Sequence, residues 1–141
     1  MRTFYIFKIK KEFVNLYLEN PNNLYKTLEH LYSLNQNDLI HGENLFSQLT
    51  DMIDKDNLDK ALFIKYHQKC NYKKRGKKHI INNIYKDEVS SLIARSSYLK
   101  IDTNNQLPEF FDYLNSYHEN FFVCDFKNQD YFFLNQIKTL V

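Results

Sequence analysis

Residue types that commonly perform chemistry are scattered along this chain rather than clustered. Its five histidines fall in no HExxH or HxH arrangement, the spacings that let two imidazoles reach one metal ion. They are His30, His41, His67, His79 and His118. The serines lie outside any GxSxG nucleophile elbow, and Cys70 and Cys124 form no CxxC. These patterns predict no catalytic residue, no cofactor and no metal, and free thiols in a reducing compartment.

Four aspartates stand close enough together to suggest calcium. They are Asp51, Asp54, Asp56 and Asp59. The EF-hand pattern needs a Gly near its middle and a closing Glu, and both are missing. A loop followed by a helix N-terminus explains the cluster, because Asp caps helices and complements their dipole. Asp125, further on, is either a structural cap of a turn or a lone acid, and we favour the cap.

Cationic side chains are concentrated between Lys69 and His79. The run contains Lys69, Lys73, Lys74, Arg75, Lys77 and Lys78. The five from Lys73 onward are candidate phosphate contacts, with Tyr72 as a stacking surface. The simpler interpretation is a solvated, mobile loop, because like charges at this density disfavour packing. The whole chain has a formal charge of only +2, which argues against a large electrostatic surface for nucleic acid. A nucleic-acid-binding module that uses this basic loop is therefore kept as the alternative function.

Length and composition set further bounds. A chain of 141 residues fits one domain, residues 1–141, that needs no disulfide or metal for stability. The N-terminus lacks the features of a signal peptide, and no window approaches the ~20 apolar residues of a membrane span. We therefore expect a cytoplasmic protein. With glycines only at Gly42 and Gly76, neither GxGxxG nor a phosphate-binding P-loop is present.

Hydrophobic periodicity changes along the chain. Residues 3–10 alternate as a strand, and helical spacing follows. Helices are expected at 11–18, 22–34, 39–53 and 58–67, with an Asn-rich break at 35–38 and a short helix at 80–85 after the basic loop. The second half predicts strands at 89–94 and 98–101, a helix from Pro108 to Tyr117, and a hairpin of 121–126 with 131–135. The order β-α-α-α-β-β-α-β-β predicts an α+β domain with a mostly antiparallel sheet of about five strands.

The first predicted helix carries two apolar stripes. Val14 and Leu18 share one face, and we expect Leu16 close to its edge. Phe13 and Tyr17 are also four apart, on a line rotated by about a hundred degrees. A surface helix needs only one stripe for the core. The aromatic pair is therefore either additional core or an exposed anchor of a protein interface, which favours a binding protein over an enzyme.

Two segments carry a family resemblance. The first is the run from Phe4 to Tyr17. The second is Phe122-Val123-Cys124-Asp125-Phe126, followed after a turn by Tyr131-Phe132-Phe133-Leu134-Asn135. They resemble the opening and the close of the SirA family, sporulation inhibitors of replication. The family's close reads Met-Asp-Phe, a turn, then Tyr-Gly-Trp-Leu-Asn-Pro. Here Phe132-Phe133 and Gln136 replace its Gly-Trp and Pro.

This resemblance implies a function and a partner. The SirA family binds domain I of the initiator DnaA and so keeps DnaA from assembling productively at the chromosomal origin. Its contact surface includes an aromatic pair on the first helix, which Phe13 and Tyr17 match. A second contact helix carries a Gln and, three residues on, a Tyr, where this chain has Leu45 and Gln48. The resemblance thus implies a non-enzymatic regulator of replication initiation that needs no cofactor.

Overall fold

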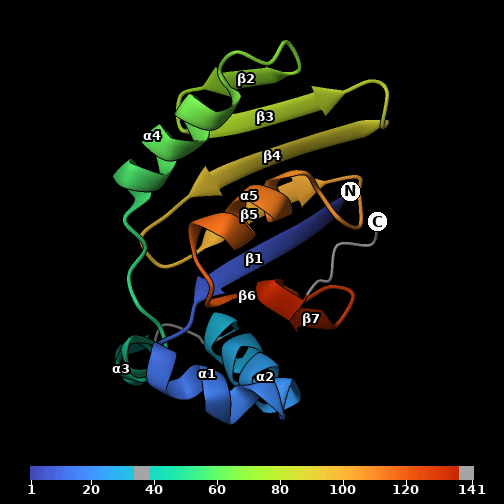
Figure 1. The fold of residues 1–141 in the computed structure, drawn as a ribbon. Helices are drawn as coiled ribbons and strands as arrows, with labels where there is room; N and C mark the ends of the chain where they lie inside the picture. The colour runs from blue at the N-terminus through green and yellow to red at the C-terminus, as the bar shows by residue number, and fades with distance from the viewer. Residues whose placement is uncertain (34–38, 137–141) are drawn as a thin grey trace.

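The computed structural model describes residues 1–33 and 39–136 of the chain. Within them, seven strands form one antiparallel sheet in the order β2-β3-β4-β5-β1-β6-β7 (Figure 1). The strands are β1 (Arg2–Lys8), β2 (Tyr72–Arg75), β3 (Lys78–Asn83), β4 (Glu88–Ala94), β5 (Leu99–Thr103), β6 (Phe121–Asp125) and β7 (Asp130–Phe133). The helices are α1 (Lys11–Leu18), α2 (Pro21–Tyr32), α3 (Leu39–Leu49), α4 (Lys55–Tyr66), α5 (Phe110–Tyr117) and the 3-10 helix η2 (Leu134–Gln136). The predicted α+β class is confirmed, but the sheet has seven strands rather than about five.

Strand β1 separates two hydrophobic cores. Its side chains alternate, so Phe4 and Ile6 point to one side of the sheet and Phe7 to the other. The first core also takes in residues of α4 and α5, which are Leu58, Leu62, Tyr66, Phe110, Phe111 and Leu114. The second core also takes in residues of α1 and α2, which are Val14, Leu24, Tyr25 and Leu28. These four helices therefore dock on the sheet through apolar residues at helical spacing.

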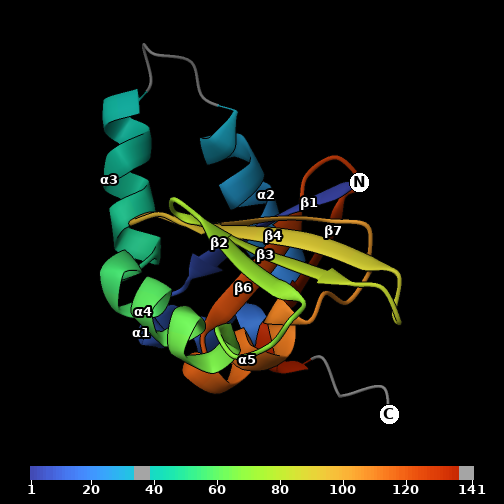
Figure 2. The same ribbon diagram turned by 90° about the horizontal axis from the view of Figure 1, so that it is seen from above.

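The two sides of the sheet are covered unequally. Seen from above, α4 and α5 lie on one side and α2 and α3 on the other (Figure 2). On this second side β1, β6 and β7 bury Phe7, Phe122 and Phe133 beneath helices, and we call this area the covered half. Beside it, the side chains that β2 to β5 present on this same side are half-buried or exposed, and we call this area the open half-face. The open half-face consists of Lys73, Arg75, Lys78, Ile80, Asn82, Val89, Ser91, Ile93, Lys100 and Asp102.

The basic segment 69–79, which we expected to be a loop, contains most of a hairpin. Strands β2 and β3 pair from Tyr72↔Ile81 to Arg75↔Lys78. Gly76 has φ +59°, which suits the first position of a two-residue type II′ turn. The helix expected at 80–85 was also wrong, because β3 continues to Asn83.

Other boundaries differ from the expectation by smaller amounts. Helix α3 ends at Leu49, so Met52 and Ile53 lie in the connection to α4. Asp54 caps α4 by accepting a hydrogen bond from the Asn57 amide at 3.1 Å, as the capping interpretation of the aspartate cluster expected. The predicted helical end at Leu34 and the break at 35–38 lie outside the described residues.

Candidate functional site

Helix α1 is fixed at its beginning to the end of α3. The Lys10 amide donates a hydrogen bond to the Leu49 carbonyl at 2.9 Å, and Ile9 pairs with Thr50 as an isolated bridge. The Asp51 amide returns a bond to the Lys8 carbonyl at 2.8 Å. These backbone contacts join the end of α3 to the start of α1 (Figure 1). The two helices that carry the expected partner-binding residues are therefore held together by the backbone.

The side chains of α1 divide into an inner and an outer group. Val14 is the innermost, with 7 % of its surface exposed, and Phe13, Tyr17 and Leu18 are half-buried against the same core. Leu16 is 64 % exposed. The expectation that Leu16 lies at the edge of the Val14/Leu18 face was wrong. Successive residues rotate by about 100° on a helix, which places Leu16 on the opposite side, one turn from Phe13.

The aromatic pair thus lies at the rim between core and solvent. Phe13 and Tyr17 are neither fully buried nor fully exposed, and Leu16 extends their line outward. Among the described residues, the Tyr17 hydroxyl has no hydrogen-bond partner. The outer side of α1 is consequently a small apolar surface with three members. Sequence reasoning missed Leu16, although its position opposite Val14 on a helical wheel was the available signal.

Leu45 and Gln48 lie on the outer side of α3. Leu45 is 40 % exposed and Gln48 is exposed, whereas Phe46 and Leu49 face inward. The Phe46 ring meets the Phe7 ring edge-on, with centroids 5.8 Å apart. Among the described side chains, no hydrogen bond or ring contact joins Leu45 or Gln48 to the aromatic pair. The structure joins the end of α3 to the start of α1, and it leaves these side chains as separate surface groups.

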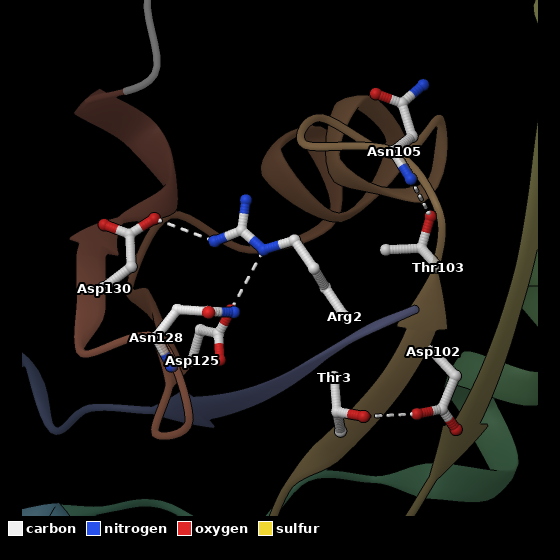
Figure 3. Close-up of polar contacts among 8 residues, drawn as sticks. All are labelled: Arg2, Thr3, Asp102, Thr103, Asn105, Asp125, Asn128 and Asp130. Atoms are coloured by element: carbon white, nitrogen blue, oxygen red, sulfur yellow. Dashed lines mark hydrogen bonds and ion pairs between the residues drawn. The ribbon is translucent and has the colours of Figure 1, made fainter.

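A polar network joins Arg2 of β1 to the β6–β7 turn (Figure 3). The buried Asp125 carboxylate accepts hydrogen bonds from Arg2 Nε at 3.0 Å and from Asn128 Nδ2 and the Asn128 amide at 2.7 and 3.2 Å. Arg2 also reaches Asp130 at 3.1 Å. Burial alone would raise the pKa of Asp125, but the bonds from Asn128 and Arg2 outweigh it and lower that pKa. Asp125 is therefore the cap of a turn.

His79 is a buried titratable side chain outside this network. Its Nε2–H donates to Asp59 Oδ1 at 2.8 Å, so its Nδ1 accepts from the Tyr72 hydroxyl at 2.7 Å. Burial lowers the pKa of His79, although Asp59 opposes the shift. Both ring nitrogens are occupied within the fold, which identifies a structural bridge between α4 and the β2–β3 hairpin.

Comparison with protein families decides which proteins this chain resembles. A family model described as sporulation inhibitor of replication protein SirA matches residues 2–138. The chain belongs to the SirA family. The comparison with curated proteins found no match. The SirA match includes both terminal segments that carried the resemblance, and it extends through the middle of the chain.

Three further observations concern the candidate chemistry of the described residues. Among the described residues, no group of three or more His, Cys, Asp or Glu side chains could hold a metal ion. Burial raises the pKa of Cys124, which opposes formation of a reactive thiolate. In the described part of the chain, no helix is long and apolar enough to cross a membrane. The outer sides of α1 and α3 are the surfaces that the SirA resemblance singles out.

Proposed function

We propose that this SirA-family protein limits the initiation of chromosomal replication by binding domain I of DnaA through α1 and α3. Phe13, Tyr17 and Leu16 form the apolar anchor, and Leu45 and Gln48 form its edge. The observation that carries the proposal is the exposure of Leu16 beside two half-buried aromatic rings. The family description, an inhibitor of replication, supports a protein partner in that process.

The shape of the anchor suits a protein partner. Single exposed apolar side chains are common on protein surfaces, but residues at i, i+3 and i+4 on one helix form a continuous patch. Partly buried rings lose little further conformational entropy when a partner covers them. The Lys10–Leu49 backbone hydrogen bond and the Ile9–Thr50 bridge hold the start of α1 in place before binding.

A charge placed in the patch provides the sharpest test. Leu16→Glu leaves the core intact, because the side chain is mainly exposed. We expect it to weaken binding to purified DnaA domain I by about tenfold or more, as measured by calorimetric titration. Asn15→Glu is the matched control. It adds the same charge at an exposed position on the far side of α1 and should keep wild-type affinity.

Truncations test the individual anchors. Phe13→Ala and Tyr17→Ala should each cost about 2 kcal/mol of binding free energy or more, and Leu45→Ala and Gln48→Ala less than about 1 kcal/mol. Thermal unfolding of each variant separates lost binding from lost structure, because both rings also support the core. If the wild-type protein does not bind domain I, or if Leu16→Glu binds as tightly as Asn15→Glu, the proposal is wrong.

A further inference from the structure

The strand register sorts the basic run onto two sides of the sheet. Lys73 and Arg75 lie on the open half-face, whereas Tyr72 and Lys74 lie on the side of His79. Paired positions continue across the sheet from Arg75 to Lys78, Ile93, Lys100 and Tyr5. Three cations therefore stand in one row that crosses β2, β3 and β5. With strands about 4.8 Å apart, the row is roughly 14 Å long.

This row has no internal neutralisation. Arg75 and Lys78 are directly opposite each other, and like charges in that position destabilise a sheet. Among the described residues, neither they nor Lys73 and Lys100 take part in an ion pair. The one carboxylate on the open half-face, Asp102, accepts a hydrogen bond from Thr3 Oγ1 at 2.6 Å (Figure 3). An anion laid along the row would relieve the repulsion between its cations.

The surface around the row is hollowed. A depression of about 430 Å³ lies over β2 and β3, with Lys73 and Arg75 on its wall and Ile80 and Asn82 among its lining residues. Cations around a partly apolar floor suit a ligand that combines negative charge with flat apolar groups. A nucleotide chain has this chemistry.

Aromatic rings stand at the other end of the row. Tyr5 contacts the rings of Tyr32, Tyr98 and Phe126 at centroid distances of 5.0, 5.6 and 5.6 Å. Tyr32 is 55 % exposed, and its hydroxyl lies 2.9 Å from that of Tyr5. The Tyr32 ring is therefore held in place by its neighbours and is still accessible to solvent. Such a ring offers a base a stacking surface.

We propose that the open half-face binds a single strand of nucleic acid. Arg75, Lys78, Lys100 and Lys73 contact its phosphates, and a base stacks on Tyr32. A duplex keeps its bases stacked on one another, so it has no free base face for Tyr32 and should bind less tightly. An acidic protein could pair with the cations, but its carboxylates would not stack on the Tyr32 ring. The surface involves no residue of α1 or α3, so this inference stands independently of the proposed interaction with DnaA.

Fluorescence anisotropy of a labelled oligothymidylate of about 12 nucleotides provides the test. The full chain should bind this single strand, and it should bind the duplex with oligodeoxyadenylate less tightly. Between roughly 50 and 200 mM salt, the logarithm of the binding constant should fall with a slope of about −2 to −3, as expected for three or four phosphate contacts.

Charge-matched variants locate the site. The triple variant Arg75→Gln, Lys78→Gln and Lys100→Gln should lose about tenfold or more in affinity and flatten the salt dependence. The control triple Lys11→Gln, Lys60→Gln and Lys65→Gln removes the same charge from exposed positions on α1 and α4, and it should stay within about twofold of wild type. Tyr32→Ser should weaken binding by about fivefold or more without changing the salt slope. Thermal unfolding verifies that each variant is folded.

Four results would overturn the inference. The first is no binding of the single strand at low salt. The second is an equal loss in the two triple variants, which would show that net charge alone is at work. The third is tighter binding of the duplex. The fourth is equal binding of polyglutamate or of anionic lipid vesicles, which would identify an acidic protein or a membrane as the partner.

Discussion

The covered half and the open half-face belong to one side of one sheet, yet they have opposite surfaces. On the covered half, the positions that point to this side include Phe7, Phe122, Cys124 and Phe133, and these four are buried. On the open half-face, the positions that point to this side include four cations, Lys73, Arg75, Lys78 and Lys100. Since the backbone pairing is continuous, the side chains determine which strands pack against helices. The apolar residues pack against α1 to α3, and the cations leave the neighbouring strands exposed to solvent.

This division assigns different roles to the two halves. The covered half positions α1 through Val14, so the anchor proposed for DnaA depends on its packing. The open half-face contributes little apolar burial on this side, and its charges are free to meet a ligand. Substitutions in the covered half should therefore act mainly on stability, and substitutions on the open half-face mainly on binding.

The largest expected effect comes from emptying the covered half. Phe122→Ala removes a fully buried ring that packs on Phe133 with centroids 4.8 Å apart. We expect the free energy of unfolding to fall by about 3–5 kcal/mol, as measured by urea denaturation. Ile93→Ala on the open half-face is the comparison, and it should cost about 1 kcal/mol or less because Ile93 is only half-buried. Equal losses at the two positions would contradict the division.

The next effect tests the turn that closes the covered half. Asp125→Ala leaves the hydrogen-bonding groups of Arg2 and Asn128 unpaired and should cost about 1–3 kcal/mol. Asp130→Ala removes the exposed partner of Arg2 and should cost less than about 1 kcal/mol. The pKa of Asp125 is lowered, so its contribution is present above its ordinary pKa of roughly 3.9 and is lost as the pH falls further. If the difference in unfolding free energy between the wild type and Asp125→Ala stays constant well below the ordinary carboxyl pKa, this account is contradicted.

A smaller effect is expected at His79, which supports the β2–β3 hairpin on the side opposite the open half-face. The pKa of His79 is lowered, so the unfolded chain binds the proton more readily than the fold does. Stability should be complete above roughly pH 6.5 and should decline below it, by at most about 1.4 kcal/mol per pH unit. In His79→Gln this part of the decline should disappear from urea unfolding series. His118, whose pKa is also lowered, is present in both proteins and cancels in the comparison.

The same contrast explains which elements the sequence could predict. The sequence predicted several elements because their apolar residues follow a single period, strand-like or helical, that packing against the core requires. These are the strand at residues 3 to 10, the helices α2, α4 and α5, and the hairpin at residues 121 to 135. Strand β2 was missed because Lys73, Lys74 and Arg75 hide its alternation, and only Tyr72 faces the core. Ile80, Ile81 and Ile84 fit a helical stripe equally well, so the sequence did not distinguish β3 from a helix.

The candidate sites were predictable to different degrees. Phe13 and Tyr17 were proposed as contact residues from helical spacing and the family resemblance, but their half-burial depends on how α1 packs on the second core. The row of Arg75, Lys78 and Lys100 was beyond sequence reasoning, because Lys100 joins it only through the pairing of β4 with β5. Long-range register of this kind has no local signal in the chain.

The smallest expected effect addresses why the open half-face keeps its charges. Lys78→Glu places a carboxylate opposite Arg75 and turns a repulsive cross-strand pair into an attractive one. The free energy of unfolding should rise by about 0.2–1 kcal/mol at low salt. The gain should shrink as added salt shortens the Debye length from about 10 Å at 0.1 M to about 3 Å at 1 M. Lys77→Glu makes the same charge change in the turn, without a residue paired opposite, and should gain less. Since Lys78→Glu should also weaken single-strand binding, higher stability with lower affinity would indicate that these cations are kept for a ligand at some expense of stability. A loss of stability, or a gain that salt does not reduce, would show that Arg75 and Lys78 do not repel each other in the folded protein.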